Sequence, residues 1–126
     1  MDYLNYNVVT LAYLGDAVYE LFIRESLLRD NRVSGSRPDL MNRAAVRYVK
    51  ATAQCESIKR LLGDDRLTDD ELALVKRARN HKPNSKAKNA SMVEYKWATA
   101  FEALLGYLYL SNQKERLTEI MEETYE

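Results

Sequence analysis

The chain has 126 residues and a formal net charge of zero, a size that favours a single domain with its own hydrophobic core. It is 46% hydrophobic and 30% charged, which excludes a disordered chain, and no apolar run is long enough to span a membrane. One cysteine and one histidine exclude an internal disulfide and argue against a Cys/His zinc site. The N-terminus lacks the basic flank and apolar stretch of a secretory signal, so we expect a cytoplasmic protein with one domain over residues 1–126.

Four glycines and two prolines leave little material for β-turns, which favours long helices over a many-stranded sheet. Residues 8–28 are predicted to form a helix that is apolar on most sides and therefore central in the fold. Asp16 lies in this helix and is expected where water is scarce. One apolar face carries Leu11, Leu14, Val18, Leu21, Phe22 and Leu28, and a second face, which is also mostly apolar, carries Ala12, Asp16, Tyr19 and Ile23.

Four further helices are predicted from apolar periodicity and from capping residues at their starts. The helix that begins near Ser36 either continues or kinks before it ends at Gly63. The helix that begins after Ser91 is strongly buried, like the helix over residues 8–28, and it ends near Leu110. A loop is predicted over residues 81–90, because Pro83 disfavours a helix there. With no strand alternation, the predicted fold class is all-α. The capping residues are Ser36 with Pro38 in the first turn, Thr68 with Glu71, Ser91 with Glu94, and Asn112 with Glu115.

Two carboxylates, Asp16 and Glu102, lie in the two most apolar helices, each near a glycine inside its helix, Gly15 or Gly106. Glycine inside a helix costs ~1 kcal/mol relative to alanine, so its presence indicates a close approach of two helices. If the helices cross at these glycines, the acids face each other and need a cation, or one stays protonated. Oxygen ligands favour Mg²⁺ or Mn²⁺ over zinc. The alternative is that each acid pairs with an arginine or lysine, or caps backbone groups.

The zero net charge hides a basic segment from Lys76 to Ala90, which contains six basic residues and no acidic one. Such a segment favours a polyanionic partner, while the alternative is a solvated loop balanced by acidic neighbours. A second group, Arg43, Arg47 and Lys50, has the spacing of one exposed helix face, and an ordinary solvated face explains it equally well.

The segments LGDAVYE (residues 14–20) and FEALLGYLYL (residues 101–110) together resemble the catalytic domain of the ribonuclease III family. The similarity is to the bacterial form that consists of this domain alone, Mini-ribonuclease III. It covers essentially the whole chain, including RAAVRYVKATAQ and RARN. It implies a ribonuclease III-type fold with two central buried helices, and a homodimer that cleaves both strands of double-stranded RNA with Mg²⁺, for which Mn²⁺ substitutes. In that family the expected role is ribosomal RNA maturation, here of the 23S precursor.

The resemblance matches Asp16 and Glu102 to the catalytic, metal-binding residues of the family. Two further carboxylates that are usual in the family are replaced here by Ala12 and Thr99. Water, the Thr99 hydroxyl or RNA phosphate oxygens would then complete the coordination of the metal. We therefore expect metal binding to be weaker before the substrate arrives.

RNA affinity is expected to come from the catalytic domain itself, since no residues after Glu126 remain for a separate binding domain. Lys and Arg side chains contact phosphates, and short polar side chains suit the shape and the 2′-hydroxyl groups of A-form RNA. The candidate RNA-binding residues are Lys76, Arg77, Arg79, Asn80, Lys82, Asn84, Ser85, Lys86 and Lys88, together with Asn89.

Glu20 and Thr99 are candidate outer residues of the metal site, although Glu20 also has the spacing of an ion pair with Arg24. His81 is placed in the basic loop and away from the acids, which does not favour a role as general base. Cys55 is expected to be a small buried apolar group. Two other functions remain open: a non-catalytic double-stranded RNA-binding dimer of the same fold, and a helical dimerisation module for another protein. Neither DNA nor a membrane is expected as a partner.

Overall fold

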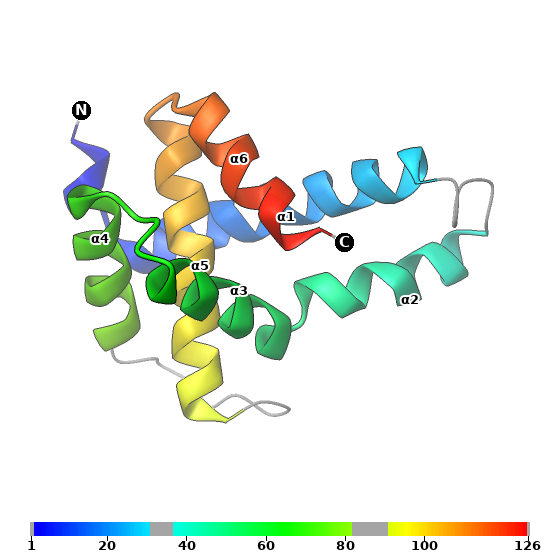
Figure 1. Cartoon of the computed structure of the whole chain (residues 1–126), viewed down its shortest axis with the longest axis horizontal. Coiled ribbons are helices and arrows are strands. Elements are labelled where there is room, and N and C mark those ends of the chain that lie inside the picture. Colours follow the sequence, from blue (N-terminus) through cyan, green and yellow to red (C-terminus); the bar gives the residue numbers. More distant parts are fainter. Residues whose placement is uncertain (1, 31–36, 82–90, 126) are drawn as a thin grey trace.

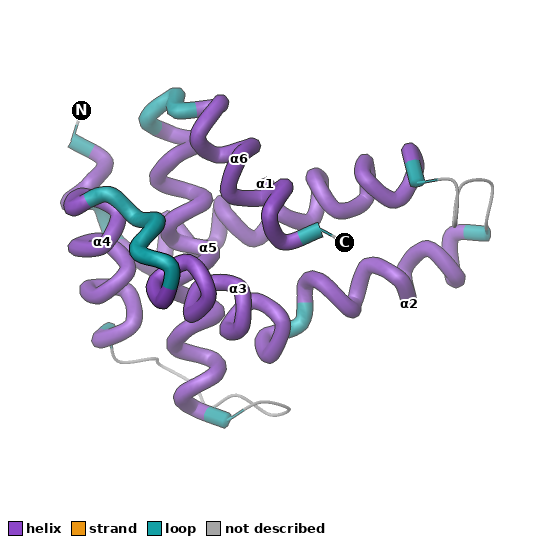
Figure 2. The backbone as a smooth tube through the Cα atoms, in the orientation of Figure 1, coloured by secondary structure: helices purple, strands orange, loops and turns teal. Residues whose placement is uncertain are grey.

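The computed structural model describes residues 2–30, 37–81 and 91–125. These ranges contain helices and no strand, so the all-α class predicted from the sequence is confirmed (Figure 2). No described helix combines the length and the apolar character that crossing a bilayer requires. The elements are a short 3-10 helix, η1 (Tyr3–Asn5), and the α-helices α1 (Val8–Arg29), α2 (Pro38–Val49), α3 (Ala51–Gly63), α4 (Asp69–Asn80), α5 (Met92–Leu110) and α6 (Lys114–Thr124).

Helix α5 lies at the centre of the fold, and α1, α3, α4 and α6 pack around it (Figure 1). Helix α1 crosses α5, and their contact is the most extensive between any two described helices. From Phe101 to Leu108, every residue of α5 except Glu102 is buried. A helix that is apolar on nearly all sides belongs at the centre of a domain. The prediction of two central helices is therefore confirmed.

Backbone atoms of α1 and α5 approach closely at two glycines. A Cβ atom placed on Gly15 would lie 1.7 Å from the backbone oxygen of Glu102, and one placed on Gly106 would lie 2.0 Å from the backbone oxygen of Leu11. Only glycine permits this approach, because the neighbouring atoms belong to the backbone and cannot turn aside. The predicted crossing at the two glycines is therefore confirmed, and it sets Glu102 against the residue that precedes Asp16.

The second predicted face of α1 is buried at Ala12, Tyr19 and Ile23, whereas the first is buried only in part. Leu21 and Leu28 are 68% and 60% exposed, so their predicted place in the core is wrong. The small residues at positions 12 and 15 let α5 approach closely, and this gives their face the larger packed contact. The buried residues of α1 are Val8, Leu11, Ala12, Gly15, Tyr19, Ile23 and Leu27.

Three helix boundaries bear on the predictions. The alternative of a kink before Gly63 is confirmed, because Lys50 has extended backbone angles (φ −66°, ψ 153°) and separates α2 from α3. Arg37 occupies the N-cap position of α2, and Ser36 lies outside the described residues. Asn112 does not cap α6, since it adopts a left-handed φ of 60° in the turn after α5. Asparagine tolerates this conformation better than most residues, which explains its place in the turn.

The capping boxes predicted at the starts of α4 and α5 are both present. In α4, the Thr68 hydroxyl accepts a hydrogen bond from the Glu71 backbone, and the Glu71 carboxylate accepts one from the Thr68 backbone. Glu71 is 2% exposed and also accepts hydrogen bonds of 2.8 and 3.0 Å from the Arg116 guanidinium of α6. This ion pair between a buried glutamate and a half-buried arginine joins α4 to α6, and the sequence analysis did not predict it.

Candidate active site

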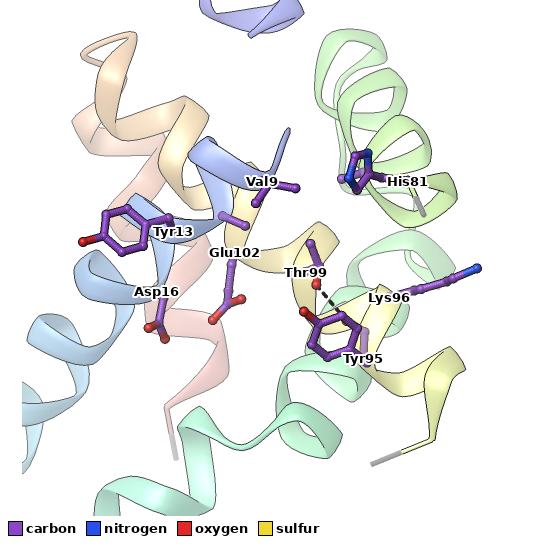
Figure 3. A pocket seen from close by; sticks show the side chains of 10 residues that line it. Val9, Tyr13, Asp16, His81, Tyr95, Lys96, Thr99 and Glu102 are labelled. Atoms are coloured by element: carbon purple, nitrogen blue, oxygen red, sulfur yellow. Dashed lines mark hydrogen bonds between the residues drawn. The ribbon is translucent and has the colours of Figure 1, made fainter. Parts of the chain in front are cut away.

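A pocket of about 410 Å³ lies where α1 crosses α5, beside the end of α4 (Figure 3). The sides of the pocket come from three segments that are far apart in the sequence. They are Val9, Ala12, Tyr13 and Asp16 from α1, Ala78 and His81 from the end of α4, and Tyr95, Lys96, Thr99 and Glu102 from α5.

The structure brings Asp16 and Glu102 together in this pocket. The Asp16 and Glu102 side chains lie next to each other in the pocket, and both carboxyl groups point to the same side (Figure 3). Glu102 is half-buried, whereas Asp16 is exposed. The expectation that water is scarce around Asp16 is therefore wrong, because its side chain leaves α1 beside the contact with α5 and faces the open pocket.

Burial and the neighbouring Asp16 carboxylate raise the pKa of Glu102 from 4.5 to about 8. Burial is the larger cause, because it removes water from the charged form. A hydrogen bond from the Gln54 side chain acts in the opposite direction. Near neutral pH the pair of acids therefore holds a proton unless a cation takes its place.

No arginine or lysine among the described residues forms an ion pair with either acid. The described part of the chain thus gives no support to the alternative in which basic side chains neutralise them. Two carboxylates and the Thr99 hydroxyl form an all-oxygen donor set, which fits Mg²⁺ or Mn²⁺ better than zinc. No cluster of three or more His, Cys, Asp or Glu side chains occurs within the described ranges, so water or substrate oxygens would have to complete the coordination.

The two positions at which the sequence departs from the ribonuclease III pattern both line the pocket. They are Ala12 on α1 and Thr99 on α5. The Thr99 hydroxyl donates a hydrogen bond of 3.0 Å to the backbone oxygen of Tyr95, which leaves its oxygen lone pairs free to accept or to ligate. The shorter side chains at these positions leave space beside the acid pair.

Several side chains of the pocket were not predicted from the sequence, among them three polar ones. Tyr95 and Lys96 lie one turn before Thr99 on α5, and His81 follows the end of α4. His81 lines the same pocket but lies on the side away from the acids in Figure 3, in agreement with its predicted place away from them. The spacing of residues 95, 99 and 102 marks one helix face, and this is the signal from which Tyr95 could have been predicted.

Glu20, the other candidate outer residue of the site, is not among the residues that line the pocket. Its carboxylate accepts a hydrogen bond of 2.8 Å from the Arg24 guanidinium on the next turn of α1. The alternative of an ion pair between residues four apart is therefore confirmed.

Two arginines of the basic segment make contacts within the subunit. Arg77 donates a hydrogen bond of 2.6 Å to the backbone oxygen of Leu4. The Arg79 guanidinium lies 5.1 Å from the centre of the Trp97 ring and hydrogen-bonds the Asn80 side chain. These contacts hold the two positive charges at the surface of α4 without neutralising them.

Some of the remaining candidates for RNA binding lie among the described residues and others do not. Lys76 is exposed on α4, and the secondary candidates Arg43, Arg47 and Lys50 are exposed on and after α2, as predicted. The candidates outside the described residues are Lys82, Asn84, Ser85, Lys86, Lys88 and Asn89.

The all-helical fold and the acidic pocket define the catalytic domain of a ribonuclease III-type endoribonuclease. The Ribonuclease III domain family matches residues 9–113, and the chain belongs to this family. It is 42% identical over 120 residues to the Mini-ribonuclease 3 of Enterococcus faecalis, covering 95% of this chain and 89% of that one. It is 47% identical over 114 residues to the Mini-ribonuclease 3 of Symbiobacterium thermophilum, covering 90% and 84%. A crystal structure of a protein from Fusobacterium nucleatum has a similar fold, with a TM-score of 0.82 and 32% identity over 94% of this chain and 90% of that one.

Proposed function

We propose that the chain is a Mg²⁺-dependent endoribonuclease that cleaves double-stranded RNA at the pocket holding Asp16 and Glu102, and that Mn²⁺ can replace Mg²⁺. The observation that carries this proposal is the pair of facing carboxylates, which no described basic side chain neutralises. Two such acids at the edge of an open pocket are suited to a hard divalent cation.

Asp16 and Glu102 would hold the cation through their carboxylate oxygens, with the Thr99 hydroxyl or water beside them. A bound Mg²⁺ supplies an activated water and polarises the scissile phosphodiester. Glu102 would have to be deprotonated in this role, because metal ligands bind in their deprotonated form. Hydrolysis of this kind leaves 5′-phosphate and 3′-hydroxyl ends.

Binding of the RNA backbone is proposed for the basic segment, with Lys96 as a cation at the pocket itself. Lys and Arg against phosphates supply most sequence-independent affinity for nucleic acid. Arg77 and Arg79 are already oriented by contacts within the subunit, so they add positive charge at little entropic cost. The residues proposed to bind RNA are Lys76, Arg77, Arg79, Asn80, Lys82, Asn84, Ser85, Lys86 and Lys88.

A homodimer and the precursor of 23S ribosomal RNA are proposed as assembly and substrate. Val9 and Tyr13 are 48% and 83% exposed on the part of α1 that borders the pocket, which suits an apolar contact between two copies. A two-fold axis would present two sites to the two antiparallel strands of a duplex. Analytical ultracentrifugation is expected to give the mass of two chains, and cells without the protein are expected to accumulate 23S precursors with unprocessed ends.

The catalytic proposal is tested with duplex RNA in Mg²⁺, Mn²⁺ or EDTA, beside single-stranded RNA and duplex DNA. Asp16→Asn and Glu102→Gln are each expected to slow cleavage of duplex RNA by at least about 1,000-fold, because each removes a charged metal ligand. Glu25→Gln is the matched control, since Glu25 is an exposed acid on α1 that pairs with Arg29. Undiminished cleavage by both acid variants contradicts the proposed site. Duplex RNA binding without any cleavage by the wild type supports the non-catalytic alternative.

The RNA-binding proposal is tested by the triple variant Lys82→Ala, Lys86→Ala, Lys88→Ala. Each lost phosphate contact is expected to reduce the slope of log affinity against log salt by about 0.7–0.9, so the triple variant binds more weakly and with less salt dependence. If both the RNA affinity and the salt slope are unchanged, the basic segment is better interpreted as a solvated loop.

A further inference from the structure

The single tryptophan of the chain, Trp97 on α5, contacts two cations that come from two other helices. The Nζ atom of Lys59 on α3 lies 5.9 Å from the centre of the Trp97 ring. The guanidinium carbon of Arg79, near the end of α4, lies 5.1 Å from the same point. Both α3 and α4 pack against α5 (Figure 1), so the three side chains form one cluster, the Trp97 cluster, where these helices meet.

Neither cation of the Trp97 cluster is neutralised within the described part of the chain. Lys59 is exposed and Arg79 is half-buried, and no ion pair between described residues includes either of them. The partners of Arg79 are the aromatic ring and the side-chain oxygen of Asn80, which are both uncharged. The face of an aromatic ring attracts a cation and orients it without removing its charge. The cluster therefore presents two oriented positive charges to a partner from outside.

The Trp97 cluster adjoins the candidate active site at two points along the chain. Trp97 directly follows Lys96, and Arg79 lies two residues before His81, and both Lys96 and His81 line the pocket. In Figure 3 these two side chains lie on the side of the pocket away from the acids. A polyanion that leaves the pocket on this side therefore passes Lys96 and meets the cluster next.

A second lysine over an aromatic ring provides a comparison within the same molecule. Lys114 on α6 lies 5.8 Å from the centre of the Tyr109 ring, nearly the same distance as in the Lys59 contact. The surroundings differ, because Lys114 shares a surface hollow with four acids, which repel a polyanion. These acids are Glu115, Glu119, Glu122 and Glu123. The same contact between a lysine and a ring thus has a basic neighbourhood at α3 and an acidic one at α6.

We propose that Lys59 and Arg79, oriented by the Trp97 ring, bind a backbone phosphate of duplex RNA beyond the cleaved bond, which makes α3 a second RNA-binding element beside the basic segment. This inference rests on the proposed binding of double-stranded RNA. A lysine that a ring already orients loses less side-chain entropy when it binds a phosphate. The ring itself does not stack on a base, because a duplex offers no unstacked base.

A purely structural role for the Trp97 cluster makes a different prediction. If the cations only join α3 and α4 to α5, their removal lowers the free energy of unfolding and leaves the RNA affinity of folded molecules unchanged. The two roles are separated by the dependence of RNA affinity on salt, because each phosphate contact adds a fixed amount to this slope.

The first experiment compares Lys59→Ala with the wild type, with Lys59→Arg and with the matched control Lys114→Ala. Binding of a labelled RNA duplex is followed by fluorescence anisotropy at several salt concentrations, in EDTA to prevent cleavage. Lys59→Ala is expected to bind about three- to ten-fold more weakly, with a slope of log affinity against log salt reduced by about 0.7–0.9. Lys59→Arg keeps the charge and the contact with the ring, so it is expected to retain the wild-type slope. Lys114→Ala is expected to stay within about two-fold of the wild-type affinity, since its surroundings are acidic.

The second experiment uses Trp97 as a reporter, because the chain has no other tryptophan. Binding of a phosphate by Lys59 and Arg79 changes the surroundings of the ring, so duplex RNA is expected to change the tryptophan fluorescence along the binding curve. Free tryptophan titrated with the same RNA corrects for absorbance by the duplex. The response is expected to be smaller in Lys59→Ala and unchanged in Lys114→Ala.

Three results overturn the inference and leave the proposed function intact. They are a wild-type affinity and slope in Lys59→Ala, an equal loss of affinity in Lys114→Ala, and a Trp97 signal that does not change while anisotropy shows that RNA binds. A wild-type protein that binds no duplex RNA overturns the proposed RNA binding, and the inference with it. A wild-type protein that binds duplex RNA without cleaving it contradicts the catalytic proposal alone.

Discussion

Two glutamates of this fold lie in opposite electrostatic surroundings. Glu71 on α4 is 2% exposed and hydrogen-bonds Arg116, while Glu102 on α5 is half-buried and faces Asp16. Burial raises the pKa of both carboxyls. At Glu71 the hydrogen bonds from Arg116 and the Thr68 backbone outweigh burial and lower the pKa below 4.5, whereas at Glu102 the Asp16 carboxylate adds to burial and the pKa reaches about 8.

The comparison shows that burial alone does not distinguish a structural acid from a functional one. Glu71 has its cation within the chain, so its charge is balanced when the protein folds. Glu102 has a second acid as its neighbour, so its charge is balanced only by a proton or by a cation from outside. Glu71 thus stabilises the fold through a partner in the chain, whereas the stability of the fold around Glu102 depends on whether a proton or a cation is bound.

The largest effect on stability is expected from breaking the structural pair. Arg116→Met leaves the Glu71 charge buried without a cation, which is expected to lower the free energy of unfolding by about 3–5 kcal/mol. Urea unfolding measures this loss, and the double variant with Glu71→Gln is expected to recover part of it. A decrease in the free energy of unfolding of less than about 1 kcal/mol would be typical of a surface ion pair, and it would contradict the structural role given to Glu71.

A smaller loss is expected at the helix crossing that supports the functional pair. Gly15→Ala places a Cβ atom 1.7 Å from the backbone oxygen of Glu102, so α1 and α5 must separate. We expect a loss of about 1–3 kcal/mol together with slower RNA cleavage, because Glu102 moves with its backbone. Gly63→Ala is the control, since nothing lies within 4 Å of a Cβ atom at that position. Equal stability and activity of the two variants would show that the crossing does not set the geometry of the acids.

Stability also depends on pH, with opposite signs at the two glutamates. Glu102 keeps its proton up to about pH 8 in the folded protein but only up to about pH 4.5 in the unfolded chain. The contribution of this proton to the free energy of unfolding is therefore complete below pH 4.5 and is lost as the pH rises to 8. Glu71 stabilises the fold at pH values above 4.5, and its contribution is lost as the pH falls through its lowered pKa.

Without divalent cations, Glu102→Gln is therefore expected to melt at a higher temperature than the wild type above pH 8, by about 5 °C, and the difference is expected to narrow toward pH 4.5. Thermal melting across this range measures it. Addition of Mg²⁺ is expected to stabilise the wild type and not the variant. Parallel melting curves at all pH values would contradict the raised pKa of Glu102.

The elements with local signals in the sequence were predicted well. Capping boxes mark the starts of α4 and α5 within four residues, and glycines inside two apolar helices mark their crossing. Leu21 and Leu28 were wrongly expected on a buried face of α1, because leucine periodicity does not show which apolar positions a neighbouring helix covers.

The rest of the site depends on contacts between distant segments. Asp16 and Glu102 were predicted to meet because a glycine accompanies each, whereas no such signal in the sequence indicates that His81 lines the opposite side of their pocket. Lys59 and Arg116 contact partners on other helices, and a single lysine or arginine in a helix has no periodic pattern that indicates its partner.

The most direct measurement is a crystal of the wild-type protein soaked in Mn²⁺ and examined by anomalous diffraction. Coordination of the cation by both acids predicts a peak between the carboxylates of Asp16 and Glu102, which disappears in a crystal of Glu102→Gln. A pocket without a peak at saturating Mn²⁺, with the two carboxyls still sharing a proton or paired with basic side chains, would contradict it.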